Sequence, residues 1–119
     1  MTARTAFAGL AAAAFLVAPA RAAAPPVGPL PPGPTMQITT NRGELVAVAL
    51  PAQPSGRVWR LKGRIDVRVV RQVSEADVGK DVVILFRATG RGTTTLSYGS
   101  TRGETPKAYA AKRFHIAVR

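Results

Sequence analysis

The chain has 119 residues, no cysteine and a formal net charge of +11, from 17 lysines and arginines against 6 aspartates and glutamates. The absence of cysteine excludes a disulfide framework, a thiol nucleophile, a cysteine-based metal cluster and a lipid anchor on an N-terminal cysteine. An apolar core alone must therefore hold the fold, and a chain of this length has room for one domain.

The N-terminus is typical of a secretory signal. Arg4 precedes an apolar stretch, residues 6–18, which is too short to span a bilayer and has the length of a signal h-region. Small residues favour cleavage after Ala22 or Ala24. We expect residues 1–24 to be a signal peptide, and the protein to be secreted or periplasmic with no stable membrane insertion after cleavage. An uncleaved anchor or a buried helix is the alternative.

A proline-rich segment comes next. Six of the ten residues from 25 to 34 are proline, which favours the polyproline II conformation and a semi-rigid spacer of about 30 Å. A ligand for a groove-type recognition module is the alternative. We expect residues 25–35 to be a linker that leads into one folded domain, residues 36–119.

The rest of the chain favours β-strands separated by turn residues. Apolar residues alternate with others in most of these segments, as Val46, Val48 and Leu50 do. Residues 74–81 are polar and contain Gly79, so we expect a loop there, with one helical turn at its start. The pattern predicts an all-β, antiparallel sandwich of about seven strands. The predicted strands are residues 36–39, 44–50, 58–62, 65–73, 82–88, 93–98 and 109–118.

No pattern in the chain indicates catalysis. His115 is the only histidine, and its alternation with Phe114 and Ile116 predicts that it faces away from the core. The acidic residues are dispersed, so no catalytic residue, metal site or cofactor is expected. The basic residues are scattered without interleaved exposed aromatics, which argues against nucleic-acid binding. We therefore predict that the protein is not an enzyme.

The most informative segment is the loop that ends at the only tryptophan, Trp59. Pro51, Pro54 and Gly56 stiffen this loop, so less ordering entropy is lost when it binds a partner. Function is often carried by such loops on a rigid scaffold. We expect Trp59 to be a core residue that anchors the base of the loop. A plain connection between strands is the alternative.

Three segments resemble the chagasin-like inhibitors of papain-type cysteine proteases. Residues 43–59 read G-E-L-V-A-V-A-L-P-A-Q-P-S-G-R-V-W, similar to a family signature in which a strand ending in Leu-Pro precedes N-P-T-T-G-[YF]-x-W. Residues 86–98 resemble the family's paired strands, and residues 114–118 its terminal strand. The resemblance covers residues 36–119 and implies an immunoglobulin-like β-sandwich. In this family three loops at one end of the sandwich enter the protease cleft, reversibly and noncovalently.

The resemblance implies a protease-binding surface, although all three loops depart from the family pattern. The first loop is one residue shorter than N-P-T-T-G, and Arg57 replaces the aromatic residue after the glycine. The second loop lacks the G-x-G-G motif, and the third lacks R-P-W. The loss of two aromatic anchors is expected to weaken inhibition by orders of magnitude. The implied binding residues are Gln53, Pro54, Ser55, Gly56 and Arg57 in the first loop, Gly79 and Lys80 in the second, and Thr101, Arg102 and Gly103 in the third.

These observations support three hypotheses. The first is an exported, monomeric inhibitor that binds a papain-like cysteine protease reversibly. The second is a non-inhibitory immunoglobulin-like binding or structural module of the cell envelope. The third is an adaptor for an anionic envelope surface, because loss of Arg4 and Arg21 with the signal would lower the net charge only from +11 to +9. The sequence does not identify a target protease.

Overall fold

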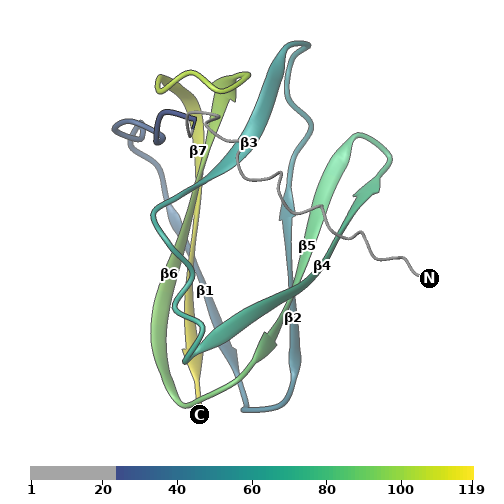
Figure 1. The fold of residues 1–119 in the computed structure, drawn as a ribbon. Helices are drawn as coiled ribbons and strands as arrows, with labels where there is room; N and C mark the ends of the chain where they lie inside the picture. The colour runs from purple at the N-terminus through teal and green to yellow at the C-terminus, as the bar shows by residue number, and fades with distance from the viewer. Residues whose placement is uncertain (1–23) are drawn as a thin grey trace, which may run out of the picture.

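A computed structural model describes residues 24–119, and these form a β-sandwich of two sheets (Figure 1). One sheet has four strands in the order β1-β7-β6-β3, and the other has three in the order β2-β5-β4. The immunoglobulin-like sandwich expected from the sequence is confirmed. The strands are β1 (Thr35–Thr40), β2 (Leu45–Leu50), β3 (Arg57–Lys62), β4 (Val70–Val78), β5 (Asp81–Ala88), β6 (Gly92–Arg102) and β7 (Ala108–Val118).

The N-terminal segment is described only in part. Apart from Ala24, the expected signal peptide (residues 1–24) lies outside the described residues. Across residues 24–119, no helix has the length and apolar character needed to cross a membrane.

The core lies between the sheets and is built from alternating side chains. Inward-facing residues of β2 and β7 are buried as the alternation predicts. Phe86 of β5 and Phe114 of β7 belong to the same core and have almost no exposed surface. Truncating either ring to alanine would cost about 3–5 kcal/mol, because the surroundings refill such a cavity only partly. The buried core residues of the strands include Val46, Val48, Leu50, Val70, Ile84, Phe86, Leu96, Tyr98, Phe114, Ile116 and Val118.

One strand pair is not antiparallel as expected. β1 runs parallel to β7, with Ile38 opposite Ile116. The chain leaves β1 through the turn at Asn41–Gly43 and enters β2 in the opposite sheet. Because no hairpin joins β1 to β7, their relative direction is not forced to be antiparallel.

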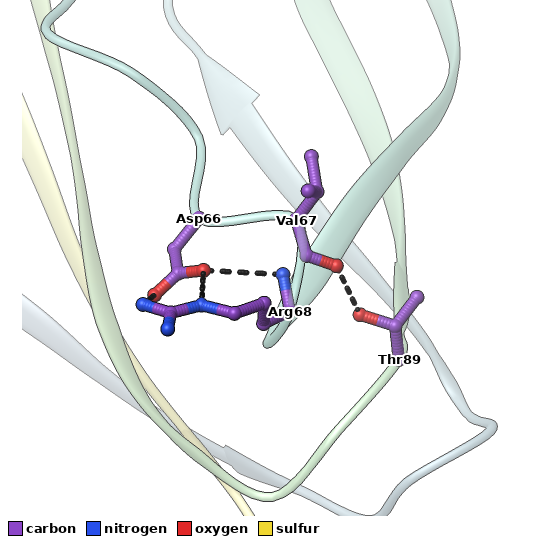
Figure 2. A network of polar contacts seen from close by, with 4 residues as sticks. All are labelled: Asp66, Val67, Arg68 and Thr89. Atoms are coloured by element: carbon purple, nitrogen blue, oxygen red, sulfur yellow. Dashed lines mark hydrogen bonds and ion pairs between the residues drawn. The ribbon is translucent and has the colours of Figure 1, made fainter.

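The fourth strand begins later than the sequence pattern predicts. Residues 66–69 form a turn, since the Asp66 carboxylate accepts hydrogen bonds from the Arg68 backbone N–H and guanidinium at 3.1–3.2 Å (Figure 2). The Thr89 hydroxyl also donates to the Val67 carbonyl at 2.8 Å. A side chain that bonds its own backbone in this way competes with strand formation. Val67 is therefore half exposed, and the strand starts at the fully buried Val70.

The fourth strand also extends into residues that were expected to form a loop. β4 continues to Val78, so the predicted helical turn at residues 74–77 is wrong. β6 likewise runs to Arg102, beyond the predicted end at residue 98. In both cases pairing with a long neighbouring strand overrides the polar local sequence.

The proline-rich residues, expected to act as a spacer, pack against the four-stranded sheet. Val27 is only 6% exposed, and it lies over Gly99 of β6 together with Leu30. A Cβ atom at Gly99 would come within 2.8 Å of the Val27 side chain and 2.9 Å of the Leu30 side chain. We call residues 25–34 the proline strap.

Hydrogen bonds fix the proline strap to two strands and to one loop. The Gly28 N–H donates to the Pro106 carbonyl at 2.7 Å, which ties the strap to the β6–β7 loop. From β3, the Lys62 ammonium donates to the Gly28 carbonyl at 2.8 Å. From β7, the Arg113 guanidinium donates to the Pro31 carbonyl at 2.8 Å. The strap is thus part of the folded unit.

Candidate functional site

Three loops lie at the same end of the sandwich (Figure 1). We call residues 51–56 between β2 and β3 the first loop, residues 79–80 between β4 and β5 the second, and residues 103–107 between β6 and β7 the third. Strand register brings them together, because Leu50 pairs with Val82 and Arg57 with Arg102. The sandwich therefore presents one composite surface made from segments far apart in the sequence.

The tip of the first loop is exposed and stiff. The Arg57 N–H donates to the Pro54 carbonyl at 3.1 Å, which closes a turn. Gly56 has φ of 86°, a conformation that disfavours other residues, and a Cβ there would meet nothing within 4 Å. Pro54 and Ser55 are exposed and Gln53 is partly exposed, with its amide donating to the Ala52 carbonyl at 3.0 Å. The tip can thus enter a concave partner without refolding.

Trp59 supports the base of the first loop in a different way from that expected. Its side chain is partly buried at the margin of the core, because β3 is an edge strand. The indole N–H donates to the Pro51 carbonyl at 2.8 Å. A tryptophan at this position can thus pack its ring and satisfy its one donor at the same time. Trp59 therefore anchors the loop both through this hydrogen bond and through the packing of its ring.

Direct hydrogen bonds join the first loop to the third loop and to the residue that follows the second loop. The Ala52 N–H donates to the Asp81 carboxylate at 3.0 Å, which fixes the first loop to the start of β5 beside the second loop. The Gly103 N–H donates to the Gly56 carbonyl at 3.3 Å, which connects the third loop to the tip of the first. Sequence reasoning did not assign this role to Asp81, since only the three-dimensional pairing shows it.

The predicted residues of the second and third loops differ in exposure. Gly79 and Lys80 are exposed at the β4–β5 turn, and Arg102 and Gly103 are exposed at the end of β6. Thr101 is fully buried, so its side chain does not face a partner. Its hydroxyl instead donates to the Gly103 carbonyl at 2.7 Å and stabilises the third loop from within.

Arg57, whose orientation could not be derived from sequence, stacks on an aromatic ring of β7. The Arg57 guanidinium carbon lies 4.4 Å from the centre of the Tyr109 ring. Arg102 approaches the same ring at 5.3 Å and Lys107 at 5.0 Å. We call Arg57, Arg102 and Lys107 the cationic cluster. It lies between the first and third loops.

A cavity of about 400 Å³ lies below the first loop, between the edge strands β3 and β4. Trp59 and Leu61 line one side, and Gln72 and Glu75 line the other. The Tyr98 hydroxyl is buried without a hydrogen-bond partner among the described residues. Burial, followed by the negative charge of Glu75, raises the pKa of Tyr98 to about 12. The phenol therefore stays neutral at physiological pH.

Histidine and acidic side chains do not gather at the loop end in the part of the chain that the structure describes. His115 lies in β7, where its Nδ1 is 3.0 Å from the Thr95 hydroxyl of the paired strand. Over residues 24–119, no three histidine, aspartate or glutamate side chains gather closely enough to hold a metal ion. What the loop end offers is a rigid surface with exposed backbone and positive charge.

The described residues thus form an immunoglobulin-like sandwich with three loops clustered at one end. No protein-family model matches the chain, and no curated protein matches it. A solved structure does: the cysteine protease inhibitor EhICP2 from Entamoeba histolytica is 17% identical in sequence, with a TM-score of 0.56. The match covers 73% of this chain and 100% of that chain. The fold expected from the chagasin-like resemblance is thereby confirmed.

Proposed function

We propose that the protein is an exported, reversible inhibitor of papain-type cysteine proteases. One observation carries the proposal: three loops form a wedge at one end of a sandwich that has the fold of a cysteine protease inhibitor, and hydrogen bonds hold the first loop to the third and to Asp81 beside the second. The stiff tip at Pro54–Gly56 would enter the cleft over the catalytic cysteine. Lys80 and Arg102 would contact the two walls.

Inhibition of this kind needs shape and rigidity, and no covalent bond forms. The first loop is held at its base by Trp59 and at its side by Asp81, so little conformational freedom remains to be lost on binding. Occupation of the cleft by backbone would keep a substrate carbonyl away from the protease thiolate. The inhibitor would then leave unchanged, because no group on it reacts.

The departures from the family pattern set the expected affinity. The residue after the glycine at the tip is Arg57 and not an aromatic residue, and its side chain stacks on Tyr109 of β7. Aromatic anchors contribute about 2 kcal/mol or more each to an interface. We therefore expect weaker binding than the family motif would give, in the micromolar rather than the nanomolar range.

A titration of active papain tests the proposal. The protein covering residues 25–119 is added up to ~10 μM while hydrolysis of a fluorogenic peptide is followed. We expect a loss of rate that dilution reverses. The absence of any inhibition at this concentration would contradict the proposal, since even a weak interface would be half occupied there.

A matched pair of variants locates the binding surface. Ser55→Arg adds bulk at the exposed tip of the first loop, and we expect it to weaken inhibition at least tenfold. Thr93→Arg makes a similar change at an exposed position near the opposite end of the sandwich. It should leave inhibition unchanged. Equal effects of the two substitutions would show that the loop end is not the binding surface.

One observation favours the second candidate, a non-inhibitory binding module of the cell envelope. The exposed loop residues Pro54, Ser55, Gly56, Gly79 and Lys80 include no aromatic side chain. A pull-down from an envelope extract separates the two functions. Recovery of a cysteine protease as the main partner supports the inhibitor, and its absence beside another abundant partner supports the module.

A further inference from the structure

Three positive side chains converge on one tyrosine at the loop end of the sandwich. Arg57, Arg102 and Lys107 lie 4.4, 5.3 and 5.0 Å from the centre of the Tyr109 ring. The ring is 36% exposed, and Arg102 and Lys107 are exposed as well. The cationic cluster is therefore a surface feature that a partner can reach.

The arrangement places like charges directly against each other. Arg57 of β3 is the register partner of Arg102 of β6. Like charges at opposed positions of an antiparallel pair destabilise it. Within residues 24–119 the only ion pair joins Arg68 to Asp66, at the far end of the sandwich. Glu104 forms no ion pair with the nearby Arg102. No ion pair among the described residues therefore offsets the repulsion within the cluster.

The tyrosine ring keeps these charges in place. A guanidinium stacked on an aromatic face gains cation–π attraction while its N–H groups point outward in a fixed fork. Such a fork matches the two oxygens of a carboxylate. Because the side chains are already ordered, less entropy is lost when an anion binds.

We infer that the cationic cluster is a docking surface for an acidic protein patch, formed by aspartates and glutamates that border the cleft of the target protease. The inference rests on the proposed function, because the cluster lies between the first and third loops that would enter that cleft. Its three charges suit a few carboxylates. A membrane surface would call for a broad basic face, whereas the three cations of the cluster converge on a single ring.

The first experiment measures the cluster without any protease. Labelled deca-glutamate is titrated with the protein at low salt, and binding is followed by fluorescence anisotropy. Removing two exposed cations should weaken binding about tenfold in Arg102→Gln/Lys107→Gln. The control, Arg42→Gln/Arg91→Gln, loses the same charge at the far end and should stay within twofold of the wild type. Equal weakening of the two variants would overturn the inference.

The second experiment identifies the partner. Association with two papain-type proteases, one of acidic and one of basic net charge, is measured from low to physiological ionic strength. We expect faster association with the acidic protease, a decline with salt, and loss of this difference in Arg102→Gln/Lys107→Gln. Identical association with both proteases would refute an acidic partner surface, even with inhibition intact.

Failure of the proposed function has a different signature. If neither protease is inhibited while deca-glutamate still distinguishes the variants, the inhibitor proposal and the protease partner are both wrong, and only the anion-binding cluster stands.

Binding to phosphatidylglycerol vesicles tests a membrane surface as the alternative partner of the cluster. Tighter binding to these vesicles than to deca-glutamate at equal anion concentration would contradict a protein partner.

Discussion

Undocking the proline strap is the sharpest perturbation that the fold allows. Val27 is 6% exposed and lies over Gly99, so Val27→Asp would place a carboxylate in an apolar contact. Burial of a valine contributes about 1.5–3 kcal/mol, and the strap would detach rather than bury the charge. We therefore expect a loss of about 2 kcal/mol in the free energy of unfolding, which lowers the melting temperature by roughly 10 °C in a domain of this size.

Two measurements check this reasoning. Thermal unfolding compares Val27→Asp with Val73→Asp, a control at a valine of β4 that is 44% exposed. Hydrogen exchange follows the Gly28 amide, whose bond to the Pro106 carbonyl should protect it in the wild type and not in Val27→Asp. Gly99→Val should also undock the strap, because its side chain would occupy the space of Val27. An unprotected Gly28 amide in the wild type would refute the docked strap outright.

Three further predictions follow from single contacts. Asp81→Ala removes the acceptor of the Ala52 N–H and should weaken protease inhibition about tenfold, whereas Asp81→Asn keeps an acceptor oxygen and should inhibit like the wild type. Equal inhibition by the wild type and both variants would contradict the role of this hydrogen bond. Tyr98→Phe removes a buried hydroxyl without a partner, so chemical denaturation should show unchanged or slightly greater stability, and absorbance titration should lose the ionisation near pH 12. Hydrogen bonds from the Asn41 backbone N–H and the Thr40 hydroxyl lower the pKa of Glu44, so its contribution to stability is present above the ordinary carboxyl pKa and is lost as pH falls through the lowered value. Glu44→Gln should therefore make the denaturation midpoint less sensitive to acid, and an unchanged pH profile in this variant would disprove the role of Glu44.

Hydrophobic alternation was sufficient to predict much of the sandwich. Val46, Val48 and Leu50 face the core because β2 pairs on one side with β5 and covers one face of the interior. The exposed tip of the first loop followed from its prolines and Gly56, and the structure adds that Gly56 has a positive φ. Local chemistry fixes both features, so local sequence predicts them.

The features that were missed depend on contacts between distant segments. The Asp66 carboxylate converts an apparently alternating stretch into a turn, and its partner Arg68 is not distinguished by pattern alone. The strap is specified by Val27 meeting Gly99, more than seventy positions along the chain. A proline-rich composition cannot predict such docking, because the same composition also suits a free spacer.

The position of Arg57 connects the proposed function to the cationic cluster. Where the family motif has an aromatic residue beside the cleft-entering glycine, this chain has a guanidinium that turns toward Tyr109. Apolar contact mainly slows dissociation, and the exchange removes it. The exchange also adds a positive charge, which mainly speeds association with an acidic partner. Inhibition by this protein should therefore depend on salt through its association rate. Restoring an aromatic with Arg57→Tyr should instead lengthen the lifetime of the complex and reduce its dependence on salt.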